Sequence, residues 1–269
     1  MKELNQRRYE FKQKLRQRKP VFGAWTSLGH PSITEIFSRI GVDFVGVDIE
    51  HSTISQEQTQ RIITASQVNG TLCLPRIATH NQEMIKRLLD SGADGLMVPM
   101  VSLPEEAEKI IPWCKYPPEG SRSFGVARAQ GYGFDFDEYV SAWNDSSSLI
   151  MQIETVKGVE NIDQILSFEQ IDGVMVGPYD ISGSLGIPGQ LDHPKVNQAA
   201  IRVIDSCRRH NKACGTHIVD PDMKAIEDKF KLGYTFVVLA SDIFLLWKWS
   251  ERMRNITDQI RKKERVSTQ

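Results

Sequence analysis

The sequence predicts a single-domain (β/α)8 barrel, the TIM-barrel fold. Short apolar runs alternate with amphipathic stretches along most of the chain, and the apolar runs number eight. Repeated strand–helix units form parallel strands that helices cover, and eight such units close a barrel. A doubly wound open sheet is the alternative, but its glycine-rich dinucleotide turn is missing from the sequence.

Composition agrees with this fold and narrows the classes of function. The chain has 269 residues, 40% of them hydrophobic and 25% charged, and a formal net charge of −1. Single barrels often have this length, and the balanced charge favours neither nucleic acid nor an acidic surface as a partner. The sequence shows no run of 18 apolar residues, so no membrane span is expected, and its start lacks the apolar segment of a signal peptide. The four cysteines form no CxxC pair, which favours reduced thiols and a cytoplasmic location.

The eight apolar runs are the predicted strands. Each is short and bounded by polar or turn-forming residues, as expected for strands buried on both faces. In chain order they are VFGAW (21–25), FVGVD (44–48), LCLPR (72–76), GLMVP (95–99), LIMQIE (149–154), GVMVG (173–177), ACGTHI (213–218) and FVVLA (236–240).

The stretches between the runs predict helices. Apolar residues recur at helical spacing in residues 55–70 and 81–92, and the second of these ends at Gly92, a stop signal. Similar patterns predict helices over 193–211 and 221–233. The longest interruption, residues 131–148, predicts an elaborated loop with a short helix rather than a domain boundary.

One helix is predicted at each end of the domain, which comprises residues 1–269. The first spans about residues 1–19 and is rich in Arg and Lys. We interpret these cations as a solvated helix face rather than an RNA contact. The last helix spans about residues 241–262, and its segment LLWKW (245–249) is typical of a helix that packs on a partner subunit.

Charged side chains gather where the predicted strands end, which is where barrels of this kind carry their catalytic groups. Asp48, Glu50 and His51 follow the second strand, and Arg76 ends the third. An Asp that supports a His suits acid–base catalysis, whereas a helix-start carboxylate and a loop histidine are the structural alternative. Arg76 is predicted to bind an anion such as an enolate or a carboxylate. Its alternative is a structural ion pair with Glu50 or Asp48.

The fifth and sixth strands suggest a metal site. Glu154 and Asp180 follow adjacent strands, and paired carboxylates suit a hard divalent cation such as Mg²⁺ or Mn²⁺. The alternative is that each carboxylate caps a helix or a turn. Gly177, Pro178 and Tyr179 precede Asp180, and backbone N–H groups of this turn are candidates for holding a substrate carboxylate, although a plain turn has the same pattern.

Several motifs resemble one known family. They are DIEH (48–51), LPR (74–76), RLLDSGADGLMVPMV (87–101), YPPEGSRSFGVARAQGYG (116–133), QIET (152–155) and GPYDIS (177–182). In this order and spacing they resemble the HpcH/HpaI family of class II pyruvate aldolases, from about residue 20 to residue 247.

The resemblance implies a (β/α)8 barrel whose last helix is exchanged between the subunits of a homo-hexamer, a trimer of dimers. It implies a carbon–carbon lyase, an aldehyde-lyase that depends on a divalent metal ion (Mg²⁺, Mn²⁺ or Co²⁺) and forms no Schiff base. The expected substrate is a 4-hydroxy-2-keto acid, such as a 2-keto-3-deoxy sugar acid from carbohydrate acid catabolism. The expected products are pyruvate and an aldehyde.

The resemblance also implies roles for individual residues. Many members have Ala where this chain has Tyr179, so the identity of the aldehyde stays open. By position, Glu154 and Asp180 match the metal ligands, Asp48 and His51 the acid–base pair, Arg76 the arginine near the pyruvyl keto oxygen, and Pro178, Tyr179 and Asp180 the backbone that meets the pyruvate carboxylate.

Other interpretations remain. A lyase or mutase of a CoA thioester or a phosphoenol acid needs a further basic pocket, and none is clear in the sequence. A catalytically silent small-acid-binding protein needs neither both carboxylates nor His51. Glu50 either braces Arg76 or is structural, Arg128 either meets an anionic aldehyde or forms a loop ion pair, and His217 is a candidate lining residue.

Overall fold

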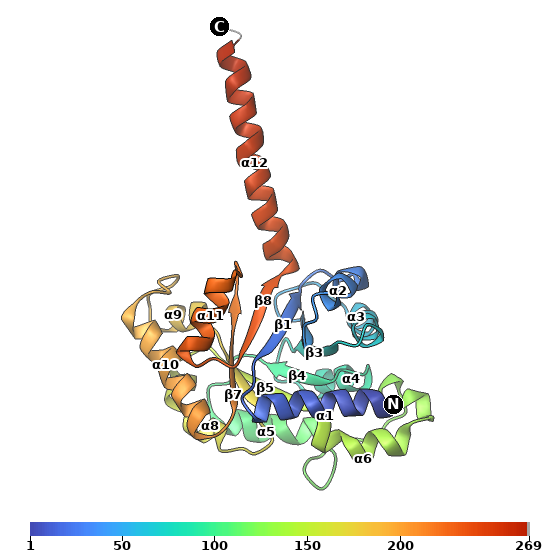
Figure 1. Cartoon of the computed structure of the whole chain (residues 1–269). Helices are drawn as coiled ribbons and strands as arrows, with labels where there is room; N and C mark the ends of the chain where they lie inside the picture. Colours follow the sequence, from blue (N-terminus) through green and yellow to red (C-terminus); the bar gives the residue numbers. More distant parts are fainter. Residues whose placement is uncertain (268–269) are drawn as a thin grey trace.

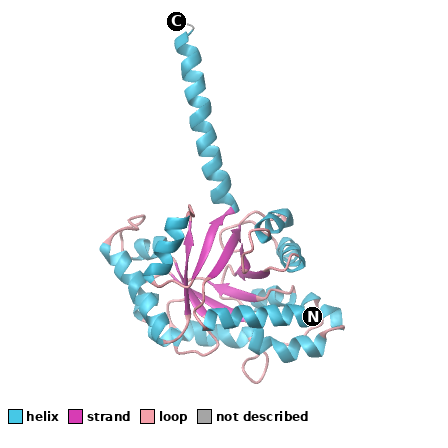
Figure 2. Ribbon diagram, viewed as in Figure 1, coloured by secondary structure: helices cyan, strands magenta, loops and turns pink. Residues whose placement is uncertain are grey.

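The computed structural model describes residues 1–267 and confirms the (β/α)8 barrel. Eight parallel strands pair in chain order, and β8 closes on β1 (Figures 1 and 2). Every predicted apolar run forms a strand. The strands are β1 Val21–Thr26, β2 Phe44–Asp48, β3 Leu72–Arg76, β4 Gly95–Val98, β5 Ser148–Ile153, β6 Gly173–Val176, β7 Ala213–Ile218 and β8 Phe236–Ser241.

Helices surround the barrel, and local signals begin several of them. Ser55 forms a capping box with Gln58, and the side chains of Asn81 and Asp222 accept backbone N–H groups at two further helix starts. The helices are α1 Lys2–Arg16, α2 Pro31–Ser38, α3 Gln56–Val68, α4 Gln82–Asp90, α5 Pro104–Cys114, η1 Arg128–Gly133, α6 Phe136–Ser146, α7 Val156–Glu160, α8 Ile162–Leu166, α9 Pro178–Ser184, α10 Pro194–Arg209, α11 Met223–Leu232 and α12 Asp242–Ser267.

Large and small residues alternate across the barrel interior. A Cβ on Gly46 would lie 2.3 Å from the ring of Trp25, and one on Gly23 would lie 2.3 Å from the ring of Phe44. The two rings therefore fill the space that the glycines leave, as close packing of a small barrel requires. Phe11 of α1 joins this interior cluster, with its ring centroid 5.7 Å from that of Phe44.

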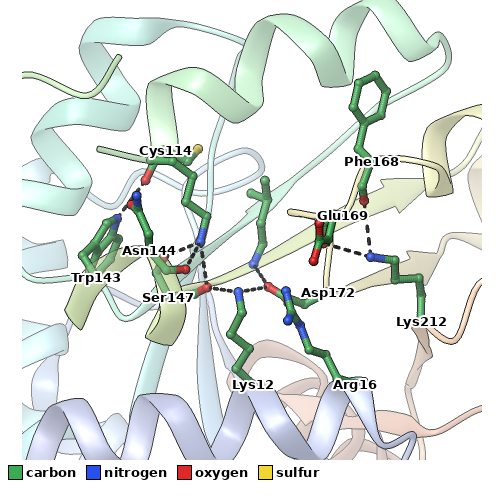
Figure 3. Close-up of polar contacts among 12 residues, drawn as sticks. Lys12, Arg16, Cys114, Trp143, Asn144, Ser147, Phe168, Glu169, Asp172 and Lys212 are labelled. Carbon is green, nitrogen blue, oxygen red and sulfur yellow. Dashed lines mark hydrogen bonds and ion pairs between the residues drawn. The ribbon is translucent and has the colours of Figure 1, made fainter. Parts of the chain in front are cut away.

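Two cations of α1 are buried, and the expectation of a solvated basic face is wrong for them. The side chains of Arg8 and Lys12 are only 1% and 2% exposed. Arg8 Nε lies 2.6 Å from Asp94 Oδ1, and Lys12 Nζ lies 3.0 Å from Asp172 Oδ2 (Figure 3). Buried charges need partners of opposite sign, and carboxylates far away in the sequence supply them.

The carboxylates that meet α1 share one position, directly before an even-numbered strand. Asp43, Asp94 and Asp172 precede β2, β4 and β6. Each also accepts a backbone N–H of the preceding strand, and the donors are Phe22 (2.9 Å), Cys73 (2.8 Å) and Leu149 (3.0 Å). Lys14 binds Asp43 at 2.7 Å. Each aspartate thus ties two neighbouring strands to α1 at the end of the barrel opposite the predicted site.

The last helix projects away from the barrel (Figure 1). It begins near the predicted residue and continues to Ser267. Its exposed apolar side chains are Ile243, Leu245, Leu246, Trp247, Trp249, Ile256 and Ile260. Within residues 1–267, no helix combines the length and the apolar character needed to cross a membrane.

Lys12→Met should destabilise the fold more than Lys14→Met. The first change removes a buried partner of Asp172, and loss of one partner of a buried pair typically costs about 3 kcal/mol or more. Lys14 is half exposed, so its ion pair contributes less than about 1 kcal/mol. Urea unfolding followed by circular dichroism measures both values. Equal losses would contradict this account of the buried pair.

Candidate active site

Arg76 lies at the mouth of the barrel and forms ion pairs with two carboxylates. It ends β3, and Asp48 ends the neighbouring β2. Arg76 Nη2 lies 2.9 Å from Asp48 Oδ2, and its Nε lies 3.2 Å from Glu50 Oε2. The ion pair that the sequence left as an alternative is therefore present, and Glu50 braces Arg76. The guanidinium is nearly buried and fixed in orientation.

The two carboxylates beside Arg76 have shifted pKa values of opposite sign. Burial opposes ionisation of Asp48, but Arg76 and the N–H of His51 outweigh it and lower the Asp48 pKa. Burial raises the pKa of Glu50, and repulsion from Asp48 and Asp180 adds to this, while Arg76 and His51 oppose it. Asp48 is thus the firm counter-ion of Arg76, and Glu50 holds its proton more strongly.

His51 lies at the rim, and its ring meets a different carboxylate from the expected one. Asp48 Oδ1 accepts the backbone N–H groups of Glu50 (3.1 Å) and His51 (3.0 Å). This is the usual turn made by an Asp side chain, and it directs that carboxylate to the backbone. The imidazole Nε2 lies 3.7 Å from Glu50 Oε2. Asp48 therefore positions His51 through its backbone, and the exposed ring is free to meet a substrate.

Two residues that sequence reasoning missed complete the surroundings of Arg76. The guanidinium carbon lies 5.0 Å from the ring centroid of Trp25, a cation–π contact. Arg76 Nη1 lies 3.4 Å from Gln152 Oε1, and Gln152 Nε2 donates to Glu154 Oε2. Strand alternation was the available signal, because Gln152 precedes Glu154 by two residues and so faces the same side.

Glu154 and Asp180 both lie beside Gly177. A Cβ on Gly177 would lie 3.0 Å from Glu154 Oε2 and 3.6 Å from Asp180 Oδ2. The predicted adjacency of their strands is confirmed, because β5 pairs with β6. Glu154 is buried, and its Oε1 accepts the N–H of Met100 at 2.6 Å. Met100 has a φ of 56°, which is unusual for a residue with a side chain.

The chemistry of this carboxylate pair fits a divalent cation. Burial raises the pKa of Glu154 to about 7; the Met100 N–H opposes this, and repulsion from Asp180 and Glu50 adds to it. A cation between the carboxylates would relieve that repulsion. Residues 1–267 contain no group of three or more His, Cys, Asp or Glu side chains arranged to hold a metal. Two carboxylates fit a cation that keeps several water or substrate ligands, such as Mg²⁺, rather than a closed tetrahedral site.

The turn after β6 offers fewer backbone donors than the sequence suggested. The N–H of Gly177 donates to the carbonyl of Ile153 at 3.1 Å, and Pro178 has no N–H. The N–H groups of Tyr179 and Asp180 belong to the first turn of α9, where no intrahelical acceptor exists. These two donors, beside the carboxylate pair, are the ones suited to an anionic group.

The two remaining candidate site residues, Arg128 and His217, lie in different parts of the structure. Arg128 Nη2 donates to Gln67 at 2.8 Å and its Nη1 to the carbonyl of Ser91 at 3.1 Å, on the side from which β4 starts. Its guanidinium is therefore a structural group away from the mouth. His217 lies at the end of β7, with its ring centroid 5.9 Å from that of Trp25. His217 is thus part of the site that Arg76 and Trp25 form.

Comparisons with known proteins identify one family of similar sequences and folds. The model of a family described as HpcH/HpaI aldolase/citrate lyase matches residues 21–248. The chain is 34% identical to a hydroxypyruvate/pyruvate aldolase of Roseobacter denitrificans, over 88% of this chain and 92% of that relative. It is 35% identical to a 2-keto-3-deoxy-L-rhamnonate aldolase of Salmonella typhi, over 87% and 88%. A crystal structure of an HpcH/HpaI aldolase/citrate lyase family protein from Burkholderia cenocepacia superposes with a TM-score of 0.86 at 27% identity, covering 94% and 99% of the two chains.

Acidification should lower the stability of the fold, because His217 is buried in its neutral form. Burial lowers its pKa from 6.5 to about 4, Arg76 lowers it further, and the backbone of Ala240 and the charge of Asp48 oppose this. Between these two values the unfolded chain binds a proton that the folded chain does not, so stability falls as the pH falls from 6.5 toward 4.

At pH 5 this linkage should cost about 2 kcal/mol relative to pH 7. Urea unfolding of wild type and His217→Leu at both pH values measures it. The variant should lose about 2 kcal/mol less than wild type on acidification, and parallel losses would contradict the assignment.

Proposed function

The chain belongs to the HpcH/HpaI aldolase/citrate lyase family, and from this premise we propose that it is a divalent-metal-dependent aldolase. The proposed reaction cleaves a 4-hydroxy-2-keto acid to pyruvate and an aldehyde. The observation that carries the proposal is the pair of carboxylates, Glu154 and Asp180, that both lie beside Gly177, in the same mouth as the fixed guanidinium of Arg76. The sugar-acid aldolase from Salmonella typhi supports a 2-keto-3-deoxy sugar acid as the substrate class.

In this proposal Glu154 and Asp180 hold the cation, Mg²⁺, Mn²⁺ or Co²⁺. When bound, the ion supplies a Lewis acid that favours the enolate of pyruvate. The N–H groups of Tyr179 and Asp180 receive the substrate carboxylate. Gln152 hydrogen-bonds both Glu154 and Arg76, and so fixes the position of the metal-binding carboxylate relative to the guanidinium.

Arg76 stabilises the charge that develops on the keto oxygen as the C3–C4 bond breaks. Because Asp48 and Glu50 fix the guanidinium beforehand, little reorganisation is needed during the reaction. Such preorganised donors typically stabilise the transition state of the reaction by about 3 kcal/mol. Trp25 covers the guanidinium on one face and limits its contact with water.

His51 accepts the proton of the 4-hydroxyl. The C4–O bond then becomes the aldehyde carbonyl, the C3–C4 electron pair moves to the pyruvyl fragment as an enolate, and protonation at C3 gives pyruvate. Glu50, with Oε2 3.7 Å from the ring, stabilises the imidazolium that forms. General base catalysis of this kind typically contributes about 10²–10⁴-fold in rate.

Pyruvate release should require both the cation and Asp180. We expect wild type to release pyruvate from racemic 4-hydroxy-2-keto acids with Mg²⁺ or Mn²⁺ and to stop with EDTA. Asp180→Asn should lower kcat/KM at least about 100-fold, because half of the carboxylate pair is lost. Asp205→Asn, an exposed carboxylate on α10, is the matched control and should keep wild-type activity.

Lactate-dehydrogenase coupling measures the pyruvate in each case. If folded, metal-loaded protein releases none from a panel of such acids, the aldolase proposal is wrong, and a lyase of a related acid or CoA thioester becomes the better interpretation.

We also propose that α12 packs on a partner subunit and that the protein is a homo-hexamer, a trimer of dimers. The exposed apolar side chains of the projecting helix support a partner, since a monomer rarely leaves so many in water. Ile36 of α2 and Ile40, just after that helix, are exposed too, and both α2 and α12 contact β1. An exchanged helix would cover both sets of side chains.

Leu246→Glu should dissociate the oligomer into smaller species. A charge on the apolar face of α12 cannot be buried in an interface without a large desolvation cost. Asn255→Glu is the matched control, since nine residues further on it lies on the opposite side of the helix. Light scattering after size exclusion reports the mass, starting from six chains of 30.5 kDa. A monomeric wild type, or equal effects of both changes, would contradict the proposal.

A further inference from the structure

His217 points into the barrel mouth from the end of β7. Ala213 belongs to the interior cluster, and a Cβ on Gly215 would meet the interior ring of Phe236, so alternation places the side chain of His217 on the same inner face. Its ring lies between two aromatic rings, 5.9 Å from Trp25 and 5.6 Å from Phe244 of α12, measured between centroids. The imidazole is thus held in place by packing.

One nitrogen of this ring is buried without a partner. Within the described residues, Nε2 of His217 has no hydrogen-bond partner. The backbone of Ala240 hydrogen-bonds the ring, and burial keeps the pKa near 4, so the imidazole is neutral at pH 7. A proton on the nitrogen that faces the Ala240 carbonyl leaves Nε2 as an acceptor. A buried acceptor without a donor costs about 1–3 kcal/mol, which a ligand hydroxyl would recover.

The backbone next to His217 is strained. Ala240 has a φ of 59°, in the left-handed region that favours glycine. It lies where the register between β1 and β8 shifts, a bulge between the pairs Gly23–Val238 and Trp25–Ser241. Strain of this kind persists where the surroundings enforce it, often beside a functional group. Here it occurs at the residue whose backbone acts on the His217 ring.

The position of His217 indicates which part of the substrate it meets. Its ring contacts Trp25 of β1 and Phe244, which follows β8, whereas Glu154 follows β5. Trp25 touches both Arg76 and His217. In the closed barrel, β8 and β1 lie across from β4 and β5, so the ring of His217 is on the side of the mouth away from Glu154. With the keto-acid end at Glu154, this is the side toward which the substrate continues beyond C4.

We propose that His217 determines specificity by accepting a hydrogen bond from a hydroxyl group on the aldehyde portion of the substrate. This inference rests on the proposed aldolase function. A neutral acceptor favours a hydroxyl and disfavours a carboxylate at the same place, because two acceptors repel. His217 therefore selects hydroxylated aldehydes and takes no part in enolate formation.

The test compares two aldehydes that differ by one hydroxyl. Glycolaldehyde and acetaldehyde are each condensed with pyruvate, and the ratio of their kcat/KM values is measured for wild type, His217→Leu and His217→Gln. We expect the ratio to fall at least about 10-fold in His217→Leu, through loss of activity with glycolaldehyde alone. His217→Gln retains an acceptor and should restore part of the ratio. An unchanged ratio in His217→Leu would overturn the inference.

A second measurement separates this inference from the proposed function. Exchange of the pyruvate methyl protons with D₂O, followed by NMR, reports enolate formation without an aldehyde. Wild type and Asp205→Asn, the exposed control on α10, should exchange at the same metal-dependent rate. No exchange in wild type would contradict the aldolase function itself. Normal exchange in wild type with loss in folded His217→Leu would show that His217 acts on the pyruvate end, and would overturn the specificity role.

Discussion

The structure depends on the attachment of α1 to three aspartates at the start of the barrel. Asp43, Asp94 and Asp172 each join a strand N–H to a cation of α1, and two of the three ion pairs are buried. Breaking a buried pair leaves an uncompensated charge, which is costly. The position of α1 is therefore coupled to the register of the strands that these aspartates precede. Because parallel strands are stiff over five residues, fixing where they start also fixes where Asp48, Arg76 and Glu154 emerge.

At the opposite end of the barrel, carboxylates outnumber cations, whereas each aspartate beneath α1 has a cationic partner. There one guanidinium faces Asp48 and Glu50, and within residues 1–267 no Lys or Arg forms an ion pair with Glu154 or Asp180. Burial is the main cause of the raised pKa values of Glu50 and Glu154, and repulsion from the neighbouring carboxylates adds to it. A mouth with surplus carboxylate suits the joint binding of a cation and an anionic keto acid, since each relieves the charge that the other faces.

Sequence reasoning predicted the strands well because burial on both faces makes them continuous apolar runs. It also placed Asp48, Arg76, Glu154 and Asp180 at one end, since that follows from strand polarity alone. It failed for Arg8 and Lys12, whose partners Asp94 and Asp172 are more than 80 residues away. It missed Trp25 and Gln152 because an inward-facing apolar or amide side chain carries no chemical signature until its neighbours are known. The contact of Asp48 with the backbone rather than the ring of His51 depends on turn geometry, which composition does not reveal.

Two residues with side chains adopt left-handed backbone at the mouth, and both act through main-chain groups. Met100 directs its N–H to Glu154, and Ala240 contacts the ring of His217. Each conformation costs of order 1 kcal/mol or more, so neither persists unless the surrounding barrel enforces it. The buried ion pairs under α1 supply rigidity at the far end, where no reaction takes place. The strained residues lie at the mouth, where their main-chain groups contact Glu154 and His217. Stability and function are thus concentrated at opposite ends of the same eight strands.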